Sequence, residues 1–170
     1  LLEMQRYQGA IVLVATMDQS LVDNYWLSLP EHDIPLVVAL EHTNFIGPEH
    51  YQGKRILYLS NYVSPDHPQF HMSKDELLAL YEPTLRRLNP AFRPDWILES
   101  WLFKDRFGQP VFDVDYSQRI PPHETGVQGL YLANTSQIYP EDRGVNFALR
   151  LGETITTIVE GGTARAPLRW

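Results

Sequence analysis

The sequence predicts an α+β fold: a mixed, mostly antiparallel sheet with one kinked helix, followed by a separate strand–loop–helix unit. Three observations support this fold. Short β-branched and aliphatic runs, separated by proline-containing turns, fill the chain up to residue 63. A helical period then replaces them at 72–90. After a polar, proline-broken stretch at 117–128, a second short strand and an amphipathic helix follow.

Four segments supply the first strands of the predicted sheet. They are AIVLVATM (10–17), YWLSL (25–29), PLVVALEHT (35–43) and KRILYLSNYV (54–63). The prolines of PEHDIP mark a turn between the second and third strands, and the fourth strand alternates residue by residue between two faces. Short strands joined by turns favour an antiparallel or mixed sheet.

The helix predicted at 72–90 begins with a capping box, because Ser73 stands three residues before Glu76. Apolar residues follow at helical spacing (Leu77, Leu78, Tyr81, Leu85, Leu88). Pro83 lies inside this pattern, and proline removes a helical hydrogen bond. We therefore expect a kink or a split near Glu82.

The later segments of the sequence predict how the whole chain divides into two units. A strand at 95–105 and a short strand at 111–116 complete a substrate-binding-like lobe over 1–116, and a linker follows at 117–128. A strand at 129–134 (GLYLAN), a loop and a helix running to about residue 160 form the second unit, 129–160. Residues 161–170 are expected to be a tail.

Composition excludes several classes of function. The chain has 170 residues, 14 basic and 21 acidic residues and a net charge of −7, and no Lys/Arg run is longer than two. These charges argue against nucleic acid or an anionic membrane surface as a partner. The sequence has no cysteine and no apolar run long enough for a membrane segment. We expect a cytoplasmic protein.

The final helix has two apolar stripes. One contains Val145, Ala148, Leu149, Gly152, Ile155, Thr156 and Val159, and the other contains Phe147, Leu151 and Ile158. A helix with two apolar faces is expected to be packed on both sides. Gly152 costs about 1 kcal/mol relative to alanine in a helix interior, so we expect another backbone to approach it closely.

The segment before this helix, QIYPEDRG, has two interpretations. Gly144, Val145 and Asn146 offer backbone N–H groups that, with the helix dipole, can bind an anion. Alternatively, Asp142 and Glu141 satisfy those donors and nothing binds there. The local sequence leaves both interpretations open.

The segment GLYLANTSQIYPEDRGVNFALRLGETI resembles the C-terminal flavin-contacting segment of the FAD-dependent amine oxidase and protoporphyrinogen oxidase superfamily. The upstream stretches LEHTNFIGPEHYQGKRILYLSNYV and YEPTLRRLNPAFRPDWILESWLFKDRFGQPVF resemble the substrate half of bacterial NAD(P)/FAD-dependent oxidoreductases of this kind. The resemblance runs from about residue 7 to 160. It implies that the second unit belongs to an FAD-binding domain.

The resemblance assigns roles to particular residues. Asn134 stands where the family has an aspartate that holds the ribityl chain. Arg143, Gly144, Val145 and Asn146 match the turn whose backbone donors face the flavin, and a helix N-terminus there stabilises the negative charge of a reduced flavin. Gln109 and Pro110 resemble the segment that passes beside the isoalloxazine ring.

One departure from the family is large. Such enzymes hold the ADP half of FAD on a G-x-G-x-x-G turn, and this sequence has no such motif. The chain therefore resembles only a C-terminal part, and we expect it to be a fragment, a separate lobe or one chain of a split protein. FAD is expected to bind only with an N-terminal FAD-binding part of the same or a partner chain.

Other side chains leave alternatives open. Thr43 and Asn44 are candidates for a substrate pocket, or they form a turn through side-chain-to-backbone bonds. His42, His50, His67 and His71 are interpreted as loop histidines and no metal site is predicted. Many aromatics mark the sheet (Tyr25, Trp26, Tyr58, Tyr62, Trp96, Trp101, Phe103), and each belongs either to the core or to the wall of an apolar cavity.

The sequence thus predicts the substrate-binding and flavin-contacting part of an FAD-dependent oxidoreductase that acts on a small molecule. It identifies no general acid or base, so the catalytic residues stay unassigned. Two alternatives remain: a part of a UDP-galactopyranose mutase-like flavoenzyme, and a non-catalytic binding or interaction module.

Overall fold

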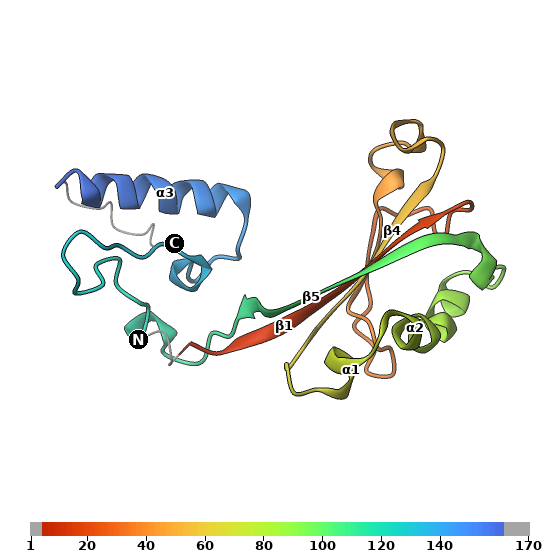
Figure 1. Cartoon of the computed structure of the whole chain (residues 1–170), viewed down its shortest axis with the longest axis horizontal. Helices are drawn as coiled ribbons and strands as arrows, with labels where there is room; N and C mark the ends of the chain where they lie inside the picture. Colours follow the sequence, from red (N-terminus) through yellow and green to blue (C-terminus); the bar gives the residue numbers. More distant parts are fainter. Residues whose placement is uncertain (1–4, 162–170) are drawn as a thin grey trace. The chain divides into compact units, whose positions relative to one another are not determined.

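The computed structural model describes residues 5–161 and divides into two compact units, one formed by Tyr7–Gln109 and the other by Leu1–Arg6 with Pro110–Trp170 (Figure 1). We call them the sheet unit and the terminal unit. The division falls at the end of the last strand, whereas the sequence placed the end of the first lobe at residue 116. The assignment of 129–160 to an FAD-binding domain remains a prediction.

The sheet unit contains a five-stranded sheet in the order β2-β3-β4-β1-β5. The strands are β1 (Tyr7–Met17), β2 (Trp26–Ser28), β3 (Val38–Glu41), β4 (Arg55–Val63) and β5 (Ile97–Pro110). The pairs β1–β4, β2–β3 and β3–β4 are antiparallel. The predicted α+β class is confirmed.

Helices α1 (Pro68–His71) and α2 (Lys74–Leu88) lie on one side of the sheet (Figure 1). Alternate residues of β1 and β4 pack with the apolar face of α2, which is why those strands alternate in sequence. The fully buried set contains Ile11, Leu13, Leu57, Leu59, Leu77, Tyr81 and Leu85. Each such aliphatic side chain contributes roughly 1.5–3 kcal/mol of burial energy.

The predicted capping box is present at α2. The Ser73 Oγ accepts from the amide of Glu76 at 3.3 Å, and the amide of Ser73 donates to Glu76 Oε2 at 2.7 Å. One continuous helix spans Pro83, so the alternative of a split at Glu82 was wrong. Buried residues on both sides of the proline, Tyr81 and Leu85, hold the two halves against the same core.

Strand β5 runs through the predicted break at residues 106–110. An added Cβ at Gly108 would lie 2.6 Å from the backbone nitrogen of Ala10, so glycine permits the close approach of β5 to β1. The separate strand predicted at 111–116 is absent, and Tyr116–Gln118 form a 3-10 turn instead. Extended pairing thus ends where Pro110 enters the terminal unit.

The terminal unit contains helix α3 (Val145–Val159) and loops. The predicted strand 129–134 is reduced to one isolated bridge, Glu124↔Tyr131. No strand among the described residues of this unit is available to pair with it, and unpaired strands do not persist alone. Rings of Phe112, Tyr116 and Tyr139 form a small cluster with centroid separations of 4.5–5.5 Å.

Helix α3 is less covered than its two apolar stripes predicted. None of its residues is buried, and Val145 and Leu149 are 79% and 67% exposed. Phe147, Leu151 and Ile158, in the other stripe, are half-buried. Within this chain only one of the two faces is thus partly packed, and the covering of the other face stays a prediction. Among the described residues nothing lies within 4 Å of an added Cβ at Gly152, so the expected backbone approach to it also stays a prediction.

Candidate functional site

The N-terminus of α3 has no side-chain cap. Gly144 is the N-cap, with an extended backbone, and its carbonyl accepts the first helical bond from Ala148 at 3.0 Å. Val145 and Asn146 are exposed. The first amides of the helix thus face a position that no described carboxylate caps.

The two acids that precede the helix bind elsewhere. The Asp142 Oδ1 accepts from the amide of Arg143 at 2.7 Å, and Glu141 forms an ion pair with Arg150 at 2.6 Å. The hydrogen bond from Arg150 lowers the pKa of Glu141. The interpretation in which these carboxylates cap the helix was therefore wrong, although the Asn146 Oδ1 lies against Gly144, 2.5 Å from the position of an added Cβ.

Asn134 occupies a turn whose bonds use its side-chain oxygen. It is the N-cap of the 3-10 turn Thr135–Gln137, and its Oδ1 accepts from the Ser136 amide at 2.9 Å and the Ser136 hydroxyl at 2.6 Å. The Gln137 Oε1 accepts from the Asn134 amide at 2.8 Å. The amide nitrogen of the Asn134 side chain is the group left for a ligand hydroxyl.

Asn134 and Arg143–Asn146 belong to the terminal unit, so the structure places the five candidate cofactor-binding residues in one unit. Gln109 is the last residue of the sheet unit and is half-buried, whereas Pro110 is buried. These positions leave Gln109 partly accessible as a candidate pocket residue and leave Pro110 as a packing residue.

Thr43 and Asn44 serve the scaffold. The buried Thr43 Oγ1 accepts from the amide of Ile56 at 3.1 Å. The Asn44 side chain donates to the carbonyls of Val22 at 2.6 Å and Asn24 at 3.1 Å. Both side chains therefore bind backbone groups, as one of the two interpretations had it, but these groups belong to distant segments and not to the turn itself.

His42, which lies directly before Thr43, was grouped with the loop histidines, and the sequence did not show its contact with Tyr51. Its Nε2 is 2.7 Å from the hydroxyl of Tyr51, and its ring contacts Tyr51 and Tyr58 edge-on at 5.4 and 6.3 Å. The side chain is half-buried, unlike the exposed His50, His67 and His71. The description of His42 as a simple loop histidine was wrong. The contact with Tyr51, nine residues along the chain, is what distinguishes His42 from the other three histidines.

The aromatic residues of the sheet lie outside the buried core. Four are exposed (Tyr25, Trp26, Trp101, Phe103) and three are half-buried (Tyr58, Tyr62, Trp96). Trp96 packs against the core beside Phe92, with ring centroids 5.8 Å apart. The other six rings are outside the core cluster, so the core interpretation fits Trp96 alone among the seven, and the cavity-wall interpretation stays a prediction.

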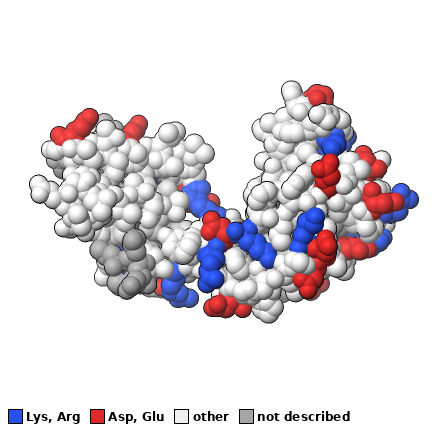
Figure 2. Space-filling view, in the orientation of Figure 1, with Lys and Arg blue, Asp and Glu red and all other residues white. Residues whose placement is uncertain are grey.

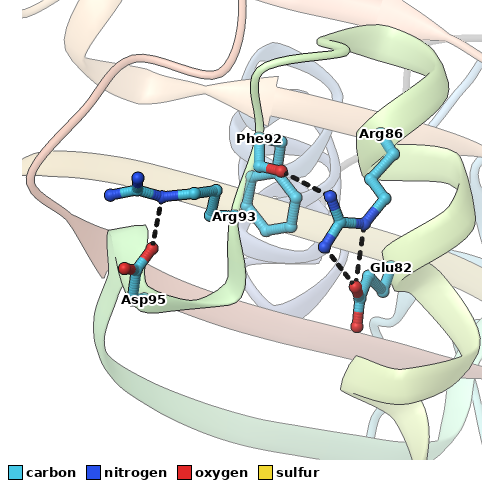
Figure 3. Close-up of polar contacts among 5 residues, drawn as sticks. All are labelled: Glu82, Arg86, Phe92, Arg93 and Asp95. Carbon is cyan, nitrogen blue, oxygen red and sulfur yellow. Dashed lines mark hydrogen bonds and ion pairs between the residues drawn. The ribbon is translucent and has the colours of Figure 1, made fainter.

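A cavity of about 330 Å³ lies beside α2 in the sheet unit. Its walls are mainly apolar (Leu78, Ala79, Leu85, Phe92, Pro94, Ile97), with Glu82 as the charged residue. Figure 3 shows how Arg86 holds that carboxylate: Nε and Nη2 lie 2.9 and 2.8 Å from Glu82 Oε1, and Nη1 donates to the carbonyl of Phe92. The charge in this cavity is therefore already paired.

The described residues contain no group of three or more His, Cys, Asp or Glu side chains placed to hold a metal ion. Within the same residues, no helix has the length and apolar character needed to cross a membrane.

Comparison with known proteins gives matches by structure. No protein-family model and no curated protein matches the sequence. A protein from Exiguobacterium sp. 255-15 that carries the name protoporphyrinogen oxidase matches with a TM-score of 0.67 at 12% identity, over 94% of this chain and 36% of its own. An oxidoreductase from Methanosarcina mazei matches with a TM-score of 0.63 at 18% identity, over 93% and 35%.

A third structure, a reduced UDP-galactopyranose mutase, matches with a TM-score of 0.53 at 17% identity, over 69% of this chain and 25% of its own. The chain has the fold of a part of these proteins. The resemblance predicted from the sequence is thereby confirmed at the level of the fold. The chain spans about a third of the length of the first structure.

Proposed function

We propose that this chain is the substrate-binding and flavin-contacting part of an FAD-dependent oxidoreductase that acts on a small molecule. The observation that carries the proposal is the fold shared over more than nine-tenths of the chain with a protein named as a protoporphyrinogen oxidase and with an oxidoreductase. A cytoplasmic location, expected from the cysteine-free sequence, belongs to the same proposal.

The residues of the terminal unit fit a flavin in part. The uncapped amides at Gly144, Val145 and Asn146 suit the electron-rich edge of the ring system, because a helix N-terminus attracts negative charge. Asn134 fits less well than the family's aspartate, since its oxygen already binds Ser136 and it brings no charge. When bound, FAD supplies the acceptor for a hydride from a C–N or C–C bond, and the electrons pass to oxygen or another acceptor.

The proposed function also requires a protein part that packs against helix α3. Most of its stripe from Val145 to Val159 is exposed, whereas Ile155 in it is half-buried. Figure 2 shows few charged side chains on the visible surface of the region around α3. Exposed apolar stripes of this kind mark interaction sites. We propose that an N-terminal FAD-binding part, in the same or a partner chain, covers this stripe and holds the nucleotide end of the cofactor.

The decisive experiment uses the complete gene product. It should purify with bound FAD, seen as flavin absorption in the visible spectrum, while the 170-residue chain alone should bind added FAD weakly or not at all. A complete product that is colourless and does not bind added FAD would exclude the oxidoreductase and favour the non-catalytic module.

The shared fold also admits a UDP-galactopyranose mutase-like activity. Arginines that bind phosphate would favour it, yet Arg86 is paired with Glu82 and Arg87 with Asp33 and Glu31. We therefore rank this function second. Conversion of a nucleotide sugar by the flavin-loaded complete product would reverse the ranking.

A further inference from the structure

The segment Glu41–Asn44 at the end of β3 is fixed by its own side chains. The buried carboxylate of Glu41 accepts from the amides of Leu21 and Val22 at 2.8 and 3.1 Å, and from the Ser20 hydroxyl. Thr43 and Asn44 bind backbone groups, as described above. His42 is the remaining residue of the four, and it is held in place by a scaffold that uses the other three.

His42 lies on the side of the sheet that faces away from α2. Leu40 pairs with Tyr58, and both have the opposite orientation to the buried Ala39 and Leu59. The ring of His42 contacts that of Tyr58. We call this side of the sheet the open face.

The pair formed by His42 and Tyr51 retains a hydrogen-bond donor in either arrangement. If the tyrosine hydroxyl donates to Nε2, the neutral imidazole carries its proton on Nδ1. If Nε2–H donates to the tyrosine oxygen, the phenolic hydroxyl keeps its own proton for another acceptor. One N–H or O–H group is therefore left over in both tautomers.

The second ring nitrogen of His42, Nδ1, makes no hydrogen bond within the described residues, because the bond to Tyr51 uses Nε2. His42 as a whole is half-buried, so part of the residue reaches solvent.

A row of apolar side chains extends from this pair across the open face. Trp26 pairs with Leu40, Leu40 with Tyr58, and Tyr58 with Val14, so the four lie side by side on four strands. Trp26 is exposed and the others are half-buried. A flat row that includes two aromatic rings suits a planar apolar molecule.

We propose that His42 and Tyr51 anchor a planar, largely apolar small molecule through a carbonyl or carboxylate group, with the rings of that molecule on the Trp26–Leu40–Tyr58–Val14 row. This proposal rests on the substrate-binding role proposed above for the sheet unit and names the chemistry of its ligand. The N–H or O–H group that the His42–Tyr51 pair does not use would bind the acceptor group of the ligand. The row of apolar side chains would contact the rings of the ligand.

The test titrates the 170-residue chain, without flavin, with 2-naphthoate, and follows backbone and imidazole resonances by NMR. The expected shifts centre on His42, Leu40 and Tyr58. 2-Naphthylmethylamine, which has the same rings but a cation in place of the acceptor, should bind about tenfold more weakly, the value of one hydrogen bond to a charged group.

His42→Phe keeps a ring but removes both nitrogens, and it should weaken 2-naphthoate binding about tenfold. His50→Phe, in the exposed part of the neighbouring turn, is the matched control and should bind as the unmodified chain does. Adding Tyr51→Phe to His42→Phe should weaken binding little further where Nδ1–H of His42 is the leftover donor, and clearly further where the Tyr51 hydroxyl is.

Two results would overturn the proposal. One is a set of shifts that maps to the cavity beside α2 or to α3 instead of the open face, which the unmodified chain alone can show. The other is equal binding by the double variant His42→Phe with Tyr51→Phe, which removes both possible donors, and by the His50→Phe chain. Binding of 2-naphthoate needs no flavin. Either result would therefore overturn this proposal without deciding whether the complete product binds FAD.

Discussion

At the scale of single residues, Glu41 is a polar side chain whose loss should lower stability clearly. Its carboxylate is fully buried and accepts from the Leu21 and Val22 amides and the Ser20 hydroxyl. Glu41→Ala leaves two amides without partners in the interior and should lower the free energy of unfolding by about 3 kcal/mol. Urea denaturation measures this loss.

The matched control is Glu49→Ala, which removes an exposed carboxylate from the next turn and should change stability by less than about 0.5 kcal/mol. Glu41→Gln keeps one acceptor and should fall between the two. Equal stability of the Glu41→Ala and Glu49→Ala chains would show that the buried carboxylate does not hold the 20–22 segment.

Tyr81 predicts a loss of stability at alkaline pH. Burial raises the pKa of its phenol from 10 to about 12, against a smaller opposing effect of the hydrogen bond from Gln69. The neutral phenol is thus favoured in the folded chain. Its contribution to stability is complete below pH 10 and is lost as the pH rises from 10 to about 12.

Urea denaturation over that pH range checks the prediction, and Tyr81→Phe is the control because it removes the titrating hydroxyl. The variant should lose less stability than the unmodified chain between pH 10 and 12. Parallel pH profiles for both chains would contradict the assignment of the raised pKa to Tyr81.

Sequence reasoning selected polar residues near the right turns but assigned several to ligands. Thr43, Asn44 and the Asn134 oxygen are used by backbone groups of the chain itself. Hydroxyl and amide side chains bind backbone and ligands with the same geometry, so their type does not decide between the two. The pairing of His42 with Tyr51 was not predicted, because Tyr51 comes from another turn.

At the scale of elements, the capping box makes α2 testable. Ser73→Ala removes the hydroxyl that accepts from the Glu76 amide, and it should destabilise the chain by about 1 kcal/mol. Hydrogen bonds from the Ser73 backbone and side chain lower the pKa of Glu76. The contribution of Glu76 is therefore present above its ordinary pKa and decreases as the pH falls below it.

Urea denaturation at neutral and acidic pH measures both effects. Ser64→Ala removes a hydroxyl that binds an exposed turn amide outside the helix, and it serves as the control. If Ser73→Ala and Ser64→Ala cost the same, the box does not stabilise α2 beyond an ordinary turn contact.

Elements with a strict period were predictable, and those that depend on a neighbour were not. The alternation of 54–63 and the capped repeat of 72–90 appear in the structure as β4 and α2. The segment 129–134 is apolar enough for a strand but has no described neighbour to pair with. Strand β5 continues past a glycine because Ala10 lies beside it, which local sequence does not show.

At the scale of the whole molecule, two observations indicate that a further protein part packs on α3. One is its exposed apolar stripe, and the other is the share of the related structures that the chain covers. The chain spans about a third of the first related structure. The sequence predicted two apolar stripes. It did not show that, within this chain, the stripe with Phe147, Leu151 and Ile158 is half-buried while Val145, Leu149 and Val159 of the other stripe are exposed. The other stripe should be covered by the proposed FAD-binding part.

Substitutions in the two stripes separate folding of the chain from assembly. Leu149→Glu lies in the exposed stripe and should change the stability of the isolated chain by less than about 0.5 kcal/mol. It should nevertheless abolish flavin binding by the complete product, because it places a charge in the proposed interface. Leu151→Glu, in the half-buried stripe, should destabilise the isolated chain itself.

Gly152 gives the sharper test, because its two predicted effects have opposite signs. In the isolated chain nothing lies near an added Cβ, so Gly152→Ala should stabilise α3 by about 1 kcal/mol. In the complete product the same methyl group should weaken FAD retention if another backbone packs there. Denaturation of the chain and the visible spectrum of the complete product measure the two effects. Stabilisation in both settings would mean that no backbone approaches this face of α3.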